Sequence, residues 1–357
     1  PVTEAITGLD LVEWQLRIAQ GQPLPLQQQQ VALNGHAIEV RLYAEDPDND
    51  FLPASGTLAL YREPPVREGC RMDSGVSQGD SVSPFYDPML AKLIVWGETR
   101  EAARLKLLQM LEQTRVAGIQ TNQAFLQRIL ALPAFAEGQI DTGFIPRYQQ
   151  QLLRNAPELD KHFWHLAAQA WLAGRKRTNG DSPWTRLTPG WRAGMPGNCR
   201  LHLRCGEQHQ QLDVQYDASC QFDDSCQFDC QFDAGAEQLL IELDGVRQRI
   251  PVAWHDQAML LYWQQQWLRI EAVDPLSSHQ GHADSGGLQA PMNGSIVSLQ
   301  VQVGDQVAAG SVLLVLEAMK MEHSIRAPQA GTVTALFCRE GELVAEGTLL
   351  VELEDMA

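Results

Sequence analysis

One lysine of the chain has the type and neighbours of a site for covalent modification. Lys320 lies between Met319 and Met321 in residues 317–321, which read EAMKM. A lysine amine is a common target of covalent modification, because it sits on a long flexible stem and forms an amide with a carboxylic acid. Taken alone, Lys320 would be an ordinary solvated surface lysine. Its meaning therefore depends on the elements that present it.

An internal repeat surrounds this lysine. Residues 290–317 align without a gap on residues 327–354, and eleven of the twenty-eight aligned positions are identical. Neither copy could bury its apolar faces alone, so we expect the copies to pack as halves of one β-sandwich. Residues 318–326 connect the halves. Lys320 is then expected at an exposed tip, where a modifying enzyme reaches it.

Three short motifs of this region carry a family resemblance. Residues 290–294 (APMNG), 317–321 (EAMKM) and 327–328 (AP) make residues 286–357 resemble the biotin carboxyl carrier domain. The resemblance implies covalent biotin on Lys320, with Met319 and Met321 at the surface that a biotin protein ligase recognises. A lipoyl domain is similar in fold, but its lysine usually follows an aspartate, so methionine on both sides favours biotin.

The first 150 residues alternate strand-like and helix-like patterns, as in an α/β or α+β segment. Apolar and polar side chains alternate over residues 36–45, which predicts a half-buried strand. We expect Thr99 to cap a helix that runs to about Thr114. We expect Thr121 to cap a second helix, which stops before Pro133.

Four motifs in this segment resemble the C-terminal part of biotin carboxylases: residues 1–4 (PVTE), 35–41 (GHAIEVR), 51–53 (FLP) and 86–92 (YDPMLAK). That family uses ATP, Mg²⁺ or Mn²⁺ and bicarbonate to carboxylate biotin, in an ATP-grasp fold. Arg41 matches the family arginine that stabilises negative charge developing on the ureido oxygen of biotin. Phe144 lies where the family closes the adenine end of the ATP pocket. Without the resemblance, Arg41 would be a solvated strand residue paired with Glu39.

The resemblance begins at Pro1, after the family's bicarbonate-binding run and without its ATP-grasp lobes. We therefore expect these residues to be the C-terminal part of a longer subunit, to which the carboxylation activity belongs.

The middle of the chain predicts a separate small domain. A helix is expected over residues 159–173, ending at Gly174, and short apolar segments alternate with turns over residues 184–273. This pattern predicts a small β-barrel with a helix. Residues 277–287 have the composition of a flexible linker. The whole reads as a multidomain α+β chain with domains at 1–150, 151–280 and 286–357.

This order of domains resembles the biotin-containing α subunits of acyl-CoA carboxylases. Residues 60–64 (LYREP), 73–76 (DSGV) and 97–103 (GETREAA) look most like 3-methylcrotonyl-CoA carboxylases, the enzymes of leucine breakdown. Geranyl-CoA and propionyl-CoA carboxylases are the alternatives within this class. The resemblance implies a hetero-oligomer, in which a carboxyltransferase β subunit binds the acyl-CoA and residues 151–280 dock that subunit. A non-catalytic carrier and interaction module is the alternative from another class.

Composition excludes several other roles. A net charge of -17 argues against nucleic-acid binding, which needs a basic footprint. No apolar run of about 20 residues is present to cross a bilayer, so we expect a cytoplasmic protein without membrane contact. Cys-Gln-Phe-Asp occurs three times within residues 220–233, but these spacings match no zinc pattern. We therefore expect no metal site there.

Overall fold

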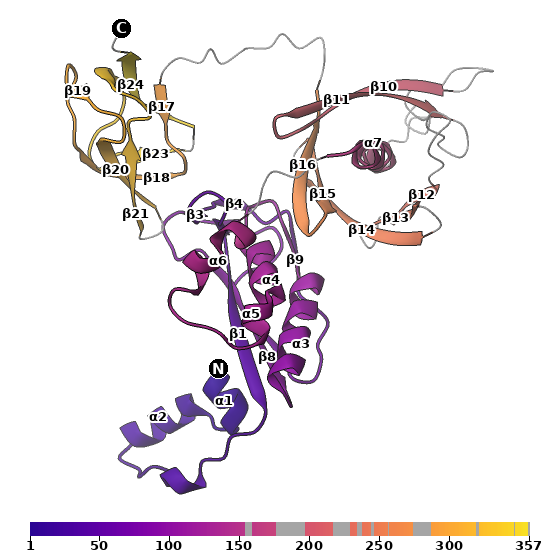
Figure 1. Ribbon diagram of the computed structural model, residues 1–357, viewed down its shortest axis with the longest axis vertical. Coiled ribbons are helices and arrows are strands. Elements are labelled where there is room, and N and C mark those ends of the chain that lie inside the picture. Colours follow the sequence, from indigo (N-terminus) through magenta and orange to yellow (C-terminus); the bar gives the residue numbers. More distant parts are fainter. Residues whose placement is uncertain are drawn as a thin grey trace. The chain divides into compact units, whose positions relative to one another are not determined.

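The computed structural model describes residues 1–153, 159–175, 197–216, 229–233, 238–243, 246–255, 257–273, 287–318, 321–345 and 347–355. The chain divides into two compact units (Figure 1). The first consists of Pro1–Arg154 together with His282–Ala357, and the second of Asn155–Gly281.

An antiparallel sheet of three strands, in the order β1-β8-β6, forms the centre of the N-terminal part. Its strands are β1 (His36–Tyr43), β6 (Cys70–Ser74) and β8 (Met89–Gly97). The predicted strand over residues 36–45 is thus confirmed as β1, which lies at one edge of this sheet. Three pairs of short strands accompany it: β2 (Glu45–Asp46) with β3 (Leu52–Pro53), β4 (Gly56–Thr57) with β7 (Ser81–Val82), and β5 (Leu60–Arg62) with β9 (Arg115–Ala117).

The N-terminal part also contains six α-helices and one short 3-10 helix among the described residues. They are α1 (Val2–Thr7), α2 (Leu11–Ala19), the 3-10 helix η1 (Gln28–Gln30), α3 (Arg100–Gln113), α4 (Gln123–Ala131), α5 (Pro133–Ala136) and α6 (Phe144–Leu152). The core forms between the sheet and α3, where Leu93 of β8 and Leu107 and Leu111 of α3 are fully buried.

Of the two helix caps predicted in this part of the chain, one is confirmed and one was wrong. Thr99 caps α3 as predicted, since its Oγ1 accepts a hydrogen bond from the backbone N–H of Ala102 at 3.1 Å. The predicted cap of the second helix was wrong, because α4 has Asn122, not Thr121, at its N-cap. The Asn122 side chain makes no capping bond, because it hydrogen-bonds to strand β1 instead.

The C-terminal part of the first unit is a sandwich of two four-stranded sheets, ordered β17-β24-β22-β19 and β21-β20-β18-β23. The predicted repeat is confirmed strand by strand, because β18, β19 and β20 recur 37 residues later as β22, β23 and β24. The bounds are β17 (Gly287–Gln289), β18 (Gly294–Leu299), β19 (Gln306–Val307), β20 (Val312–Ala318), β21 (Met321–Arg326), β22 (Gly331–Leu336), β23 (Leu343–Val344) and β24 (Leu349–Asp355).

The second unit is a seven-stranded antiparallel sheet, ordered β11-β10-β16-β15-β14-β13-β12, that curves around helix α7 (Figure 1). The bounds are α7 (Lys161–Arg175), β10 (Gly197–Cys205), β11 (Gln208–Tyr216), β12 (Asp229–Asp233), β13 (Gln238–Leu243), β14 (Val246–His255), β15 (Ala258–Trp263) and β16 (Gln266–Ala272). A helix with a β-domain was predicted here. The sheet encloses the helix, which explains why α7 is apolar on nearly all sides.

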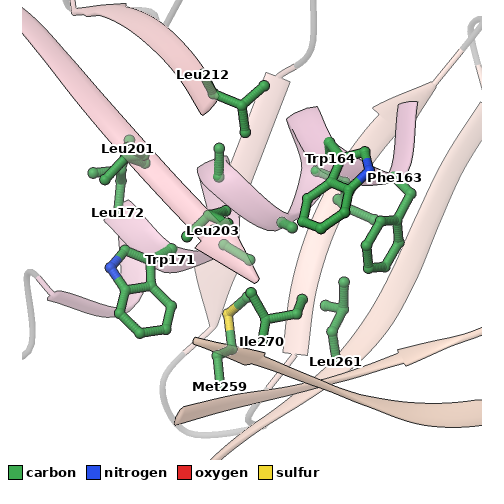
Figure 2. Packing of buried hydrophobic residues seen from close by; sticks show 14 of the residues in the cluster. Phe163, Trp164, Trp171, Leu172, Leu201, Leu203, Leu212, Met259, Leu261 and Ile270 are labelled. Atoms are coloured by element: carbon green, nitrogen blue, oxygen red, sulfur yellow. The ribbon is translucent and has the colours of Figure 1, made fainter. Parts of the chain in front are cut away.

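Aromatic side chains of α7 fill the core of this unit. Phe163, Trp164 and Trp171 are at most 5% exposed and pack among Met259, Leu261 and other apolar side chains of the sheet (Figure 2). The helix was predicted to end at Gly174, but it continues to Arg175. Gly174 lies inside the helix because the Trp254 indole packs directly against its backbone.

Two observations limit the classes of site in the described residues. No helix among them is both long and apolar enough to cross a lipid bilayer. No group of three or more His, Cys, Asp or Glu side chains in these ranges could hold a metal ion. Residues 220–228 of the Cys-Gln-Phe-Asp run lie outside the described residues, and residues 229–233 form β12.

Candidate functional site

The tip of the C-terminal sandwich is defined by the pairing of β20 with β21. These strands are hydrogen-bonded in register from Glu317↔Glu322 to Ala318↔Met321. Met319 and Lys320 join the two strands and lie outside the described residues, and Met321 is described only by its place as the first residue of β21. Seven of the nine residues that connect the two repeats are therefore strand, which leaves the modifiable lysine within a link of two residues.

Strand β18 supports the base of this tip at close range. A Cβ placed on Gly294 would lie 2.6 Å from the carbonyl oxygen of Glu317, a distance that no side chain tolerates. Glycine at this position lets β18 approach β20 closely. Gly331 makes the same approach to the carbonyl oxygen of Glu354 at 2.7 Å, as the repeat requires.

His323 lies on β21, three residues after Lys320. Burial lowers its pKa below the ordinary histidine value, which favours the neutral ring at pH 7. The charges of the described side chains nearest the tip are therefore those of the acidic Glu317 and Glu322.

Arg41 lies on edge strand β1 and lines a cleft of about 650 Å³. Its side chain is 59% exposed, and its Nε lies 3.6 Å from the Glu39 carboxylate. The Tyr43 hydroxyl, and next the Glu39 carboxylate, raise the pKa of Arg41 above its ordinary value. The cleft therefore contains a permanently charged guanidinium that is exposed but bordered by two oxygen-bearing side chains.

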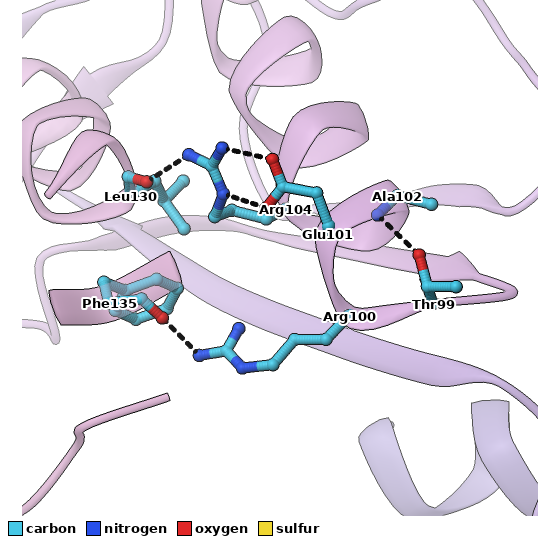
Figure 3. A network of polar contacts seen from close by, with 7 residues as sticks. All are labelled: Thr99, Arg100, Glu101, Ala102, Arg104, Leu130 and Phe135. Carbon is cyan, nitrogen blue, oxygen red and sulfur yellow. Dashed lines mark hydrogen bonds and ion pairs between the residues drawn. The ribbon is translucent and has the colours of Figure 1, made fainter. Parts of the chain in front are cut away.

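The opposite wall of the cleft is fixed by arginines of α3. Arg100 lines the cleft, donates from Nη2 to the Phe135 carbonyl at 2.8 Å, and lies 4.9 Å over the Phe135 ring (Figure 3). Arg104 forms a two-pronged ion pair with Glu101 and donates to the Leu130 carbonyl at 2.6 Å. These bonds tie α3 to α4 and α5, so that Phe135 is held in place facing β1.

Phe144 is buried at the start of α6, where it was predicted to meet an adenine ring. It is 5% exposed and packs edge-on against Phe135, with ring centroids 6.2 Å apart, and against Tyr148 at 4.9 Å. Phe144 is thus one ring removed from the cleft that Arg41 lines. Its contact with adenine stays a prediction.

Sequence reasoning missed Arg100 and Asn122 around this cleft. Arg100 reads as an exposed residue in the first turn of an amphipathic helix, and nothing in its spacing indicates the contact with Phe135. Asn122 reads as part of a helix start. Thr121, the residue before it, could cap the helix equally well. This redundancy was the one sign in the sequence that Asn122 has another role.

Four models of known families match the chain in sequence. The model described as biotin carboxylase C-terminal domain matches residues 39–147, and the one described as methylcrotonyl-CoA carboxylase, alpha-subunit, BT domain matches residues 160–275. The model described as biotin-requiring enzyme matches residues 287–353. A carbamoyl-phosphate synthase L chain ATP-binding domain model matches residues 1–27.

Curated relatives agree with these matches. The mitochondrial methylcrotonoyl-CoA carboxylase subunit alpha of Rattus norvegicus is 36% identical over 344 residues, covering 91% of this chain and 48% of that protein. The propionyl-CoA carboxylase alpha chain of Ruegeria pomeroyi is 32% identical over 361 residues, covering 91% and 52%. The biotin carboxylase domain of Hydrogenobacter thermophilus 2-oxoglutarate carboxylase is 36% identical, with a TM-score of 0.42, over 44% of this chain and 34% of that one.

The chain thus matches, in order, models of the biotin carboxylase C-terminal domain, of the BT domain of methylcrotonyl-CoA carboxylase alpha subunits and of biotin-requiring enzymes. Over nearly its whole length it is similar to alpha subunits of methylcrotonoyl-CoA carboxylase. It spans about half the length of the curated relatives that it matches.

Proposed function

We propose that the chain is the C-terminal half of a biotin-carrying α subunit of an acyl-CoA carboxylase. The complete subunit carboxylates biotin on Lys320 with ATP and bicarbonate, and a β subunit transfers the carboxyl group to an acyl-CoA, which we propose to be 3-methylcrotonyl-CoA. The observation that carries the proposal is the two-residue link containing Lys320 between the paired strands β20 and β21, in a domain that matches biotin-requiring enzymes.

The tip fits a covalently attached biotin. Because β20 and β21 are paired up to Ala318 and Met321, only two residues link them, which is the shortest common hairpin connection. Biotin supplies the ureido ring that carries the carboxyl group. The contribution of the chain is the Lys320 amine, which forms an amide with the carboxyl group of biotin, and the two strands that hold it out. We propose Met319 and Met321 as part of the surface that a biotin protein ligase recognises.

Arg41 is the proposed catalytic residue of the N-terminal domain. Its guanidinium stays protonated at every physiological pH and presents paired N–H donors in one plane, which suits an oxygen that gains negative charge. Exposure in the cleft leaves it accessible to a ligand, while Glu39 and Tyr43 restrict its side-chain orientations. It would therefore stabilise the ureido oxygen as biotin becomes a nucleophile.

ATP binding is proposed for the complete subunit. Residues 1–27 match a model of an ATP-binding domain. We propose that Phe144, which packs edge-on against Phe135, limits that site at its adenine end. The structure of the Hydrogenobacter thermophilus relative was determined with MgADP and bicarbonate, which supports ATP with Mg²⁺ or Mn²⁺ as the energy source here.

The partners and the location follow from the same proposal. Homologous α subunits support a carboxyltransferase β subunit as partner, with residues 151–280 as its docking domain, in a hetero-oligomer. We propose domain bounds of 1–150, 151–280 and 286–357, and a cytoplasmic location.

The test is the mass added to the chain when it is expressed with a biotin ligase. One biotinyl group on the peptide that contains Lys320, absent from Lys320→Arg, is the expected result. Lys161→Arg is the matched control, because Lys161 is an exposed lysine at the start of α7 and should leave biotinylation intact. An unmodified chain, or a lipoyl mass, would contradict the proposal.

A second candidate within this class is a propionyl-CoA carboxylase α subunit, which the Ruegeria pomeroyi relative favours. The two are distinguished by the acyl-CoA that is carboxylated when the complete subunit is combined with each type of β subunit. A non-catalytic carrier module would bind biotin yet show no ATP-dependent carboxylation in that assay.

A further inference from the structure

The strand that carries Arg41 has one open edge. On its paired side, Arg41 faces Lys92 of β8, and the register shift between Leu42 and Tyr43 comes from one extra residue on β8, Leu90. On its other side β1 has no neighbouring strand, because it lies at the edge of the sheet. The backbone groups of β1 that point away from β8 therefore have no ladder partners.

Asn122 occupies this open edge and acts as a substitute for a neighbouring strand. Its Oδ1 accepts the Tyr43 N–H at 3.0 Å, and its Nδ2 donates to the Arg41 carbonyl at 3.2 Å and to Glu45 Oε1 at 2.9 Å. Its own backbone N–H donates to the Tyr43 carbonyl at 3.2 Å. The side chain is 5% exposed, so these bonds are protected from water.

We propose that Asn122 is a positioning residue for Arg41, which it aligns by clamping the backbone of residues 41–45 from the free edge of the sheet. The proposal rests on the proposed function, in which Arg41 contacts the ureido oxygen of biotin. Asn122 contacts no reacting atom, and its effect passes through the backbone of β1.

The exposure of Arg41 explains why a backbone clamp matters. With a side chain that is 59% exposed, Arg41 has little packing around it to fix its direction. The direction of the Arg41 side chain depends on the backbone of β1 and on Glu39 and Tyr43, which lie on the same strand. Misplacement of a catalytic group by about 1 Å costs a rate on the order of 100-fold. Loosening strand β1 would therefore lower the rate of biotin carboxylation.

The chain offers a matched control in the next residue. Gln123 is also 5% exposed, and its Nε2 donates to the backbone carbonyls of Leu111 at 2.6 Å and Thr114 at 2.9 Å. Gln123→Ala therefore removes an equally buried amide from the same helix start without touching β1. Asn122→Asp serves as a second variant in case Asn122→Ala does not fold, since it keeps the shape but loses both donors.

The experiment compares these variants in the complete subunit by hydrogen exchange and by kinetics. In Asn122→Ala, the peptide covering residues 38–46 should exchange faster, and biotin carboxylation should fall by about 10- to 100-fold, while ATP cleavage without biotin stays unchanged. Gln123→Ala should change neither readout. In an Arg41→Ala background, Asn122→Ala should cause no further loss of rate.

Three results would overturn the clamp. They are unchanged exchange of residues 38–46 in Asn122→Ala, an unchanged rate of biotin carboxylation, and an equal loss of rate whether or not Arg41 is present. A wild-type subunit that does not carboxylate biotin would instead overturn the proposed function, and in that case the exchange of residues 38–46 still decides whether the clamp exists.

Discussion

At the scale of single residues, the N-terminal domain places one exposed, permanently charged group where a ligand can meet it. Arg41 could have formed a full salt bridge, but Glu39 lies 3.6 Å from its Nε and is only 16% exposed itself. An ion pair with so exposed an arginine is screened by water and adds little to stability. The guanidinium is therefore available to an incoming anion.

Arg41→Ala tests this availability. We expect biotin carboxylation by the complete subunit to fall by about 100-fold or more, because a preorganised donor to a developing oxyanion is lost. ATP cleavage in the absence of biotin should remain, which steady-state phosphate release measures.

Arg71→Ala is the control for this substitution. Arg71 is an arginine on β6 of the same sheet, 61% exposed and paired with Asp73. Carboxylation should be unaffected by this change, and equal losses in the two variants would argue that arginine charge in general, and not Arg41, matters.

The residues around Arg41 mark the limit of sequence reasoning. Alternation over residues 36–45 predicted the strand, and a family motif predicted the arginine. Asn122 is 81 residues away from Arg41 in the chain, and its role arises only because it lies against the open edge of β1. Local patterns do not encode such a tertiary contact, so Thr121 was predicted as the cap.

At the scale of elements, the internal repeat predicted the strands of the sandwich more accurately than residue preferences predicted the end of α7. The internal repeat located the strands of the sandwich, because a repeated sequence must place its glycines at equivalent turns; Gly304 and Gly341 both have positive φ, at 98° and 79°. By contrast, the helix predicted to end with Ala173 continues two residues further, to Arg175. Glycine usually ends a helix, but Gly174 lies within α7, where the Trp254 indole leaves no room for a Cβ.

Gly174→Ala tests the contact between α7 and β14. Alanine raises helix propensity by about 1 kcal/mol, but its Cβ would lie 2.1 Å from Cζ2 of Trp254. Overpacking of this kind costs about 1–3 kcal/mol, so we expect a net loss in the free energy of unfolding of the second unit. Urea denaturation followed by tryptophan fluorescence measures it.

A second substitution should reduce this loss of stability. Trp254→Leu makes room for the added methyl group, so Gly174→Ala should be less harmful in that background than in the wild type. Lys161→Ala, at the exposed start of the same helix, should change stability by less than about 0.5 kcal/mol. A Gly174→Ala chain as stable as the wild type would contradict the packing described here.

At the scale of the whole molecule, the proposed function requires the biotin-bearing sandwich to serve two sites. The linker predicted from composition over residues 277–287 lies, up to residue 286, outside the described residues, and its composition predicts a flexible tether. A tether raises the effective concentration of biotin at each site only if its length allows both to be reached.

Removal of residues 278–285 tests the tether. Biotinylation of Lys320 should be unchanged, because the ligase meets the sandwich alone, while carboxylation of the acyl-CoA by the complete enzyme should fall about tenfold or more. Replacement of the same eight residues by glycine and serine should restore the rate. Failure of that replacement would indicate that the sequence, not the length, is needed.

The repeat within the sandwich has a consequence for its symmetry. The two halves match strand for strand, and each has a glycine pressed against the backbone of an adjacent strand of the same half. Every position from 290 to 317 therefore has an equivalent 37 residues later. Residues 318–326 lie between the two aligned copies and belong to neither, so a feature that occurs once per molecule fits there. The proposed single attachment point, Lys320, lies in that segment.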